Sequence, residues 1–213
     1  MGSIRIPGRI YAIADAEALG SIPLPEAVGA MAAAGIGWIQ VRAKRLSGRD
    51  LFRVLDECCR VVEGTGTALW MDDRADLAAL FPVAGVHVGQ ADLPPAAVRR
   101  VLGDRLWIGL STHDEAQLAA ADADPDVDVV AVGPVFPTAS KERPDPVVGL
   151  DFVRRARART AKPLVAIGGI GAETLRAVLE AGADAAVVLG AVCRGSDLGQ
   201  ISKNARRLLS LAG

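Results

Sequence analysis

The chain has few cysteines, few aromatic residues and almost no net charge. Three cysteines among 213 residues, Cys58, Cys59 and Cys193, are too few for a disulfide framework. None of them has the CxxC spacing of a zinc or redox site. The 24 basic and 25 acidic residues leave a net charge of -1, which argues against a nucleic-acid-binding module.

Long hydrophobic runs are missing as well. No apolar run approaches the roughly 18 residues of a membrane-spanning helix, and the N-terminal segment lacks the apolar core of a secretory signal. The sequence therefore predicts a cytoplasmic protein with no membrane and no nucleic-acid partner. Its hydrophobic content of 51% is that of a chain with a substantial core.

Short apolar runs alternate with Ala-rich segments of helical spacing along the whole chain. The strand-like runs begin at Ile10, Trp38, Ala68, Gly85, Trp107, Val127, Pro163 and Ala185, and the helix-like segments begin near Pro25, Gly48, Arg74, Pro94, Asp114, Gly149, Gly171 and Asp197. Strict alternation implies a parallel sheet. Eight units predict a single α/β domain over residues 1–213, a (β/α)8 or TIM barrel, with its active site at the C-terminal ends of the strands. An open doubly wound sheet is the alternative, although no GxGxxG motif follows the first strand.

Polar side chains follow most of the predicted strands. Gln40, Arg42 and Lys44 alternate along the second strand, so they point the same way, into the barrel mouth. One amide and two cations on one face suit a polyphosphate, which arginine grips through two parallel hydrogen bonds. A solvated strand end is the plainer interpretation.

Carboxylates follow the next two strands. Asp72 and Asp73 end the third strand, and Asp92 follows the fourth. Magnesium is typically held by one or two carboxylates together with substrate oxygens and water, so these residues predict a magnesium site. Helix capping by Asp73 and Asp92 is an equally good interpretation of each residue alone.

Two histidines lie near the expected site. Ser111 and His113 end the fifth strand, where Ser111 could donate to a phosphate and His113 could transfer a proton. A cap-rich helix start explains the same residues equally well. His87, inside the fourth strand, is predicted to be a buried, hydrogen-bonded residue and not a catalyst.

The remaining candidates come from the last three strands. The irregular stretch 134–148 contains Thr138, Ser140 and Lys141, which could close over an anion. Glycines at 168, 169 and 171 and the Leu189–Gly190 pair end the last two strands, where barrels commonly bind a monophosphate. The sequence thus predicts two facing anion subsites, one for a diphosphate and one for a monophosphate.

Together these motifs resemble one family. The segments QVRAK (40–44), DDRADLA (72–78), GVHVGQADLP (85–94), GLSTH (109–113), GPVFPTASK (133–141) and VAIGGI (165–170) are similar to those of the thiamine phosphate synthases, whose sister family is the thiazole tautomerases. The resemblance implies a (β/α)8 barrel that joins 4-amino-2-methyl-5-hydroxymethylpyrimidine diphosphate to a hydroxyethylthiazole phosphate. The products would be thiamine phosphate and pyrophosphate, formed by a dissociative, magnesium-assisted substitution.

The resemblance also implies roles for individual residues. The pyrimidine diphosphate would be bound by Gln40, Arg42, Lys44, Asp72, Ser111 and Lys141, and the magnesium ion (Mg2+) by Asp73 and Asp92. Arg42, Lys44, Ser111 and Lys141 would act in catalysis. The thiazole phosphate would be bound by Thr138, Ser140, Gly169, Leu189 and Gly190.

Two positions depart from the family pattern. Asp72 stands where the family usually has asparagine, and Gly190 where it often has serine. An added carboxylate near a diphosphate costs about 4 kcal/mol per unit-charge contact at 4 Å and an effective dielectric of 20. Asp72 is therefore expected to turn away, take up a proton or share the magnesium.

Other functions stay open. A thiazole tautomerase using His113 is the main alternative, although Asp92 and Pro137–Thr138 favour the synthase because the tautomerase branch tends to lose them. A non-catalytic phosphate-binding barrel and another phosphate-binding barrel enzyme are further alternatives. The sequence leaves open whether the chain is a monomer or a homodimer.

Overall fold

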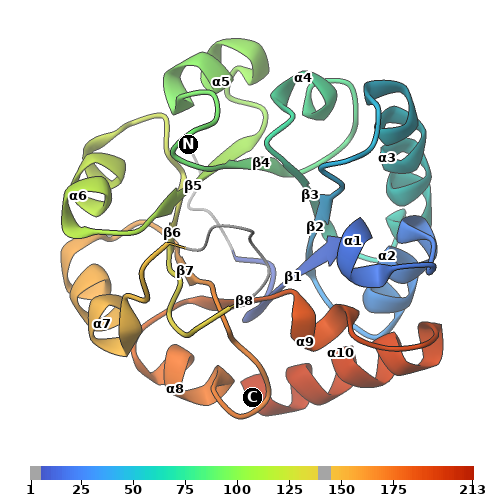
Figure 1. The fold of residues 1–213 in the computed structure, drawn as a ribbon. Coiled ribbons are helices and arrows are strands. Elements are labelled where there is room, and N and C mark those ends of the chain that lie inside the picture. Colours follow the sequence, from blue (N-terminus) through green and yellow to red (C-terminus); the bar gives the residue numbers. More distant parts are fainter. Residues whose placement is uncertain (1–5, 139–144) are drawn as a thin grey trace.

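The computed structural model describes residues 6–138 and 145–213, and its strands form one closed barrel (Figure 1). All eight are parallel and lie in chain order, and β8 pairs with β1 to close the ring. The barrel prediction is confirmed, and the open doubly wound sheet is wrong. The strands are β1 Ile10–Asp15, β2 Trp38–Arg42, β3 Ala68–Asp72, β4 Gly85–Val88, β5 Trp107–Thr112, β6 Val129–Val132, β7 Leu164–Ala166 and β8 Ala185–Val188.

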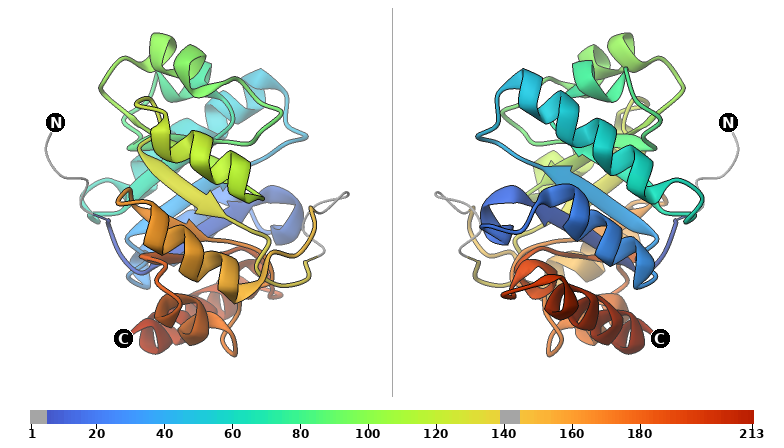
Figure 2. Two further views of the ribbon diagram at one scale, coloured as in Figure 1. Left: turned by 90° about the vertical axis from the view of Figure 1, so that its left-hand side faces the viewer. Right: turned by 90° about the vertical axis from the view of Figure 1, so that its right-hand side faces the viewer.

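Helices surround the strands on the outside (Figures 1 and 2). They are α1 Ala16–Leu19, α2 Leu24–Ala33, α3 Gly48–Val62, α4 Ala75–Ala78, α5 Pro95–Leu102, α6 Glu115–Ala123, α7 Gly149–Arg159, α8 Leu175–Glu180, α9 Gly190–Cys193 and α10 Leu198–Ala212. The sequence missed α1 and α9, which have only four residues each. None of the helices in the described part of the chain is long and apolar enough to cross a bilayer.

The predicted helix starts follow from local chemistry. Asp114 caps α6, since its Oδ1 accepts from the backbone N–H of Gln117 at 2.8 Å. Helix α5 begins at Pro95. Proline lacks an N–H, but the N–H groups of the first turn have no partner within the helix, so no helical hydrogen bond is lost there. Both predictions are confirmed.

The two faces of each strand bury different side chains. Ile39, Val41 and Ala43 join the large core between strands and helices, while Trp38 belongs to the separate cluster inside the barrel. This alternation is the one predicted for the second strand.

The barrel interior holds the single tyrosine and all three tryptophans of the chain. Tyr11 stacks on Trp38 with ring centroids 4.1 Å apart, and Trp38 lies 5.3 Å from Trp70. A β-carbon at Gly85 would lie 2.7 Å from Cε2 of Trp70, so only glycine leaves room for that ring. These rings fill the barrel below the polar strand ends.

Two acid–arginine pairs lie at the opposite end, where strands begin. Oδ2 of Asp128 accepts from a backbone N–H of β5 at 2.8 Å and from Nη2 of Arg99 on α5 at 2.6 Å. Asp184 repeats the arrangement with a backbone N–H of β7 and Nη1 of Arg157 on α7, both at 2.8 Å. Each pair ties a helix to two strands, so this end of the barrel serves stability.

Candidate functional site

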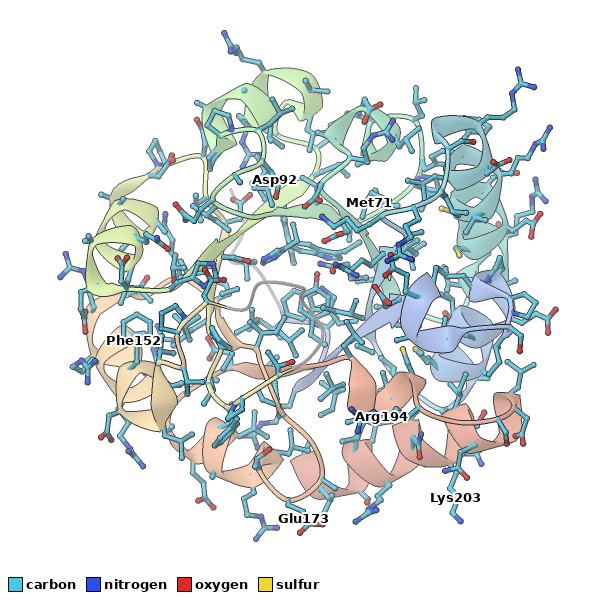
Figure 3. The ribbon with its side chains drawn as sticks, in the orientation of Figure 1. Met71, Asp92, Phe152, Glu173, Arg194 and Lys203 are labelled. Carbon is cyan, nitrogen blue, oxygen red and sulfur yellow. The ribbon has the colours of Figure 1, made fainter. Side chains whose placement is uncertain are left out.

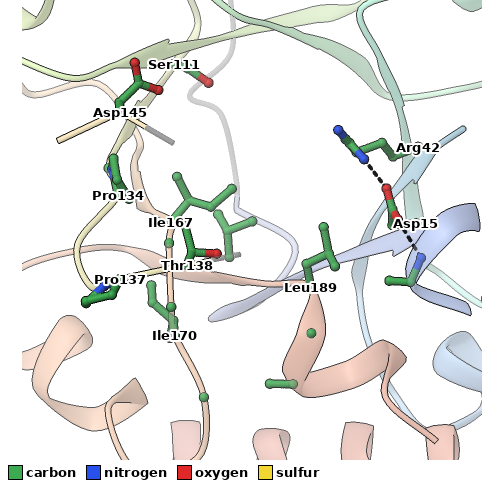
Figure 4. Close-up of a pocket in the computed structure, with 18 of the residues that line it drawn as sticks. Asp15, Arg42, Ser111, Pro134, Pro137, Thr138, Asp145, Ile167, Ile170 and Leu189 are labelled. Atoms are coloured by element: carbon green, nitrogen blue, oxygen red, sulfur yellow. Dashed lines mark hydrogen bonds and ion pairs between the residues drawn. The ribbon is translucent and has the colours of Figure 1, made fainter. Parts of the chain in front are cut away.

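A cavity of about 640 Å³ opens at the C-terminal ends of the strands (Figure 4). Its walls come from β1, β2, β5 and the segments that follow β6, β7 and β8. Six residues predicted to bind substrate line it: Arg42, Ser111, Thr138, Gly169, Leu189 and Gly190. The structure therefore brings together side chains that lie far apart in the sequence.

Arg42 lies between two carboxylates. Its Nη1 contacts Oδ2 of Asp15 (Figure 4). Its Nε is 3.6 Å from Oδ2 of Asp72. Asp15 is only 3% exposed, and its second oxygen accepts from the backbone N–H of Ala18 at 2.8 Å. The guanidinium is thus held on two sides at the edge of the cavity.

Lys44, next to this cavity, lies between Asp72 and one further carboxylate, Asp73. Its Nζ contacts Oδ2 of Asp73 and is 3.3 Å from Oδ2 of Asp72, and all three residues line a second small cavity of about 90 Å³. Burial raises the pKa of Asp72, while the nearby Lys44 and Arg42 cations oppose that shift. Asp72 therefore faces the cations and does not turn away from them.

The capping interpretation of Asp73 and Asp92 does not hold for their helices. The residue at the start of α4 is Arg74 and that at the start of α5 is Pro94, and neither helix has a side-chain cap bond. Asp92 instead accepts from the backbone N–H of Gly89 at 2.8 Å. Asp73 has a φ of 55°, a conformation that non-glycine residues rarely adopt.

The donor set fits a magnesium ion. Asp72 and Asp73 lie side by side, and Asp92 is close enough to contribute to the raised pKa of Asp72. Among residues 6–138 and 145–213 no group of three or more His, Cys, Asp or Glu residues could hold a metal by itself. Magnesium is usually held by one or two carboxylates plus substrate oxygens and water, so a site completed by a bound phosphate suits these residues.

Gln40 lies inside the barrel below Arg42. It is 2% exposed, and its Nε2 donates to the Tyr11 hydroxyl at 2.8 Å. Gln40 therefore points inward as predicted, but its amide is bonded to the interior cluster and is not part of the cavity wall.

Both histidines lie close to the cavity. Nε2 of His87 is 2.9 Å from the Ser111 hydroxyl, so the predicted hydrogen bond of this strand residue is confirmed. The predicted burial is wrong, because His87 is only half-buried. A carbonyl can only accept, so Nδ1 of His113 donates to Gly133 O at 2.6 Å. Its Nε2 lies 3.5 Å from Oδ2 of Asp145.

Glycines shape the opposite wall. Gly168 and Gly169 have φ values of 102° and 64°, and a β-carbon on Gly169 would lie 2.5 Å from the backbone oxygen of Pro137. Only glycine allows the segment after β7 to approach the segment after β6 this closely. Leu189 and Gly190 adjoin it at the start of α9. Ser140 and Lys141 lie outside the described residues.

Sequence reasoning missed several cavity residues. Asp15 directly follows the run IYAIA, so the rule that found the other strand ends would have found it too. Glu17, Asp145 and Arg194 also line the cavity, but they lie in short or irregular segments whose position no pattern in the sequence indicates.

Comparison with known proteins agrees with this geometry. The family model described as thiamine monophosphate synthase matches residues 10–192. The thiamine-phosphate synthase of Koribacter versatilis is 44% identical over 87% of this chain and 89% of its own. That of Methanocella arvoryzae is 36% identical over 94% of both chains.

A solved structure is similar over nearly the whole fold. The thiamine phosphate pyrophosphorylase of Pyrococcus furiosus superposes with a TM-score of 0.85 and 26% identity, covering 96% of this chain and 95% of that one. From the match of the family model and the identity to these relatives, the chain belongs to the thiamine monophosphate synthase family.

Proposed function

We propose that this protein is a thiamine-phosphate synthase, with its active site at the C-terminal ends of the strands of one barrel domain that spans residues 1–213. It would join the pyrimidine diphosphate to the thiazole phosphate and release pyrophosphate. One observation carries the proposal: six residues predicted to bind substrate, from five separate regions of the chain, line a single cavity. The 44% identity to a protein named thiamine-phosphate synthase supports it.

The diphosphate would bind where Arg42 and Lys44 lie, near Ser111, with Gln40 and Asp72 beside these cations. Lys141 would be a further ligand of the diphosphate. The bond between the pyrimidine methylene carbon and the diphosphate oxygen breaks first, and its electron pair leaves with pyrophosphate. Arg42 and Lys44 would stabilise the negative charge that develops on the leaving oxygens.

Asp73 and Asp92 would hold the magnesium ion, which when bound would neutralise part of the diphosphate charge. Lys44 contacts both Asp72 and Asp73, and Arg42 also lies near Asp72. Lys44 would exchange these carboxylates for phosphate oxygens when the substrate and metal bind.

The thiazole phosphate would bind at the opposite wall, through Thr138, Ser140, Gly169, Leu189 and Gly190. Its ring nitrogen then attacks the pyrimidine cation, and its lone pair forms the new carbon–nitrogen bond. Holding both substrates in one cavity makes this step effectively intramolecular.

The test is a pyrophosphate-release assay with both substrates, with and without magnesium. We expect release only when both substrates and magnesium are present, and a large loss of turnover in Arg42→Ala and Lys141→Ala. Tight ligand binding without pyrophosphate release would instead indicate a non-catalytic phosphate-binding barrel.

His113 favours one second candidate, a thiazole tautomerase. Its ring lines the cavity and faces Asp145 at 3.5 Å, an arrangement that can move a proton. Incubating a thiazole tautomer without pyrimidine diphosphate separates the two functions, because only a tautomerase would isomerise it.

We also infer a cytoplasmic location and small-molecule phosphates as the partners. The three cysteines, Cys58, Cys59 and Cys193, are free thiols, which favours a reducing compartment.

A further inference from the structure

The backbone of Arg194, just after α9, is firmly anchored. Its N–H donates to Gly190 O at 3.2 Å, and its carbonyl accepts from Nδ2 of Asn204 on α10 at 2.7 Å. The amide of Asn204 is itself held, because Gln200 donates to its Oδ1 at 2.8 Å. On the other side, the thiol of Cys193 donates to Ile13 O in β1 at 3.2 Å. The base of the Arg194 side chain therefore has a fixed place beside the barrel (Figure 3).

The guanidinium at the other end of this side chain has no counter-ion among residues 6–138 and 145–213. Arg194 is exposed and lines the large cavity, and no ion pair or side-chain hydrogen bond holds it within the described part of the chain. Two carboxylates that line the cavity are already paired with other cations. Asp15 pairs with Arg42, and Glu17 pairs with Arg45. A cation that is anchored at its base and unpaired at its head is available to a bound anion.

The Arg194 guanidinium packs beside Gly190. A β-carbon at Gly190 would lie 3.4 Å from Nε of Arg194 and 3.6 Å from Nη2, so the guanidinium lies directly against the glycine. Gly190 and Gly169 belong to the same cavity wall. Asp92, one of the two proposed metal ligands, lies across the barrel opening from Arg194 (Figure 3). Arg194 therefore lies beside Gly190, one of the residues that would bind the thiazole phosphate.

We propose that Arg194 binds the phosphate monoester of the acceptor substrate through its guanidinium and so selects a phosphorylated acceptor over the free alcohol. Arginine offers two parallel donors that match two phosphate oxygens. The inference rests on the proposed function, because it assigns Arg194 to the thiazole phosphate of that reaction.

The test compares Arg194→Gln and Arg194→Lys with Arg176→Gln. Arg176 is an exposed arginine on α8 that does not line the cavity, so its variant makes the same change of charge elsewhere. We expect Arg194→Gln to raise the KM for the thiazole phosphate by about 10- to 100-fold, the range of a charged hydrogen bond. Arg194→Lys should fall between it and the wild type, because lysine keeps the charge but lacks the two parallel donors.

The KM for the pyrimidine diphosphate and the rate at saturating acceptor should stay within about twofold of the wild type, since these depend on the other subsite. Calorimetric binding of inorganic phosphate gives a readout that needs no turnover, and Arg194→Gln should weaken it while Arg176→Gln should not. An unchanged acceptor KM with unchanged phosphate binding would overturn the inference. A raised KM for the diphosphate alone would overturn it too.

The two proposals fail in different ways. If the wild type releases pyrophosphate and Arg194→Gln behaves like it in both assays, only the role of Arg194 is wrong. If the wild type makes no product but binds inorganic phosphate in an Arg194-dependent manner, the proposed reaction is wrong and the anion site stands.

Discussion

Replacing Asp15 should impair catalysis without unfolding the barrel. Its Oδ2 contacts Nη1 of Arg42, and its Oδ1 accepts from the backbone N–H of Ala18 at the start of α1. Asparagine caps a helix about as well as aspartate does but carries no charge. Asp15→Asn therefore removes the ion pair and keeps the cap, whereas Asp15→Ala removes both.

The size of each effect follows from these contacts. A hydrogen bond to a charged group is worth about 1.5–3 kcal/mol, and Arg42 keeps its contact with Asp72 at 3.6 Å, so the guanidinium stays in the site but is less well held. If that loss falls on the transition state, kcat/KM drops by about 10- to 150-fold in both variants. The lost cap should make Asp15→Ala less stable than Asp15→Asn by about 1 kcal/mol.

Steady-state kinetics with varied pyrimidine diphosphate and urea unfolding measure the two quantities separately. We expect the catalytic losses of Asp15→Asn and Asp15→Ala to be similar while their free energies of unfolding differ. Wild-type kcat/KM in Asp15→Asn would refute the positioning of Arg42 by this carboxylate. A catalytic loss confined to Asp15→Ala would assign the effect to α1 instead.

Three further predictions concern stability. Burial raises the pKa of Asp72 in the folded state above its value in the unfolded chain. Asp72 therefore stabilises the fold at pH values below its unfolded pKa, and this stabilisation is lost as the pH rises through its folded pKa. Asp72→Asn should abolish that fall in urea-unfolding curves measured across acidic pH, and an unchanged pH profile would contradict the assignment. Gly109→Ala would place a β-carbon 2.4 Å from Nδ1 of His87, so we expect a loss of about 1–3 kcal/mol in the free energy of unfolding; a variant as stable as wild type would show that the ring has room to move. Asp128→Asn should lower the free energy of unfolding by about 2 kcal/mol or more, because the Arg99 guanidinium and a backbone N–H of β5 lose the carboxylate that accepts from both of them. The folded variant should keep its turnover, and a selective loss of activity would contradict a purely structural role.

The sequence predicted the barrel and much of the site for one physical reason. Parallel strands covered on both faces are apolar throughout, and they end together at one rim. Residues at the ends of such runs, such as Arg42, Ser111 and Gly169, must therefore meet, and all three line the cavity.

What the sequence could not predict depends on contacts between distant segments. Helices α1 and α9 are too short to show a periodic pattern, so the positions of Glu17 and Arg194 were missed. The pairing of Arg42 with Asp15, and of Gln40 with Tyr11, depends on the register between neighbouring strands. The sequence does not distinguish helix capping from metal binding at Asp73 and Asp92. In the structure, α4 and α5 begin without a cap hydrogen bond from either residue.

A crystal structure with magnesium, pyrophosphate and thiamine phosphate bound would test most directly whether this rim serves a diphosphate leaving group. We predict pyrophosphate against Arg42 and Lys44, and a metal ion that joins it to Asp73 and Asp92. Pyrophosphate bound elsewhere, or a metal ion held away from both carboxylates, would contradict that prediction.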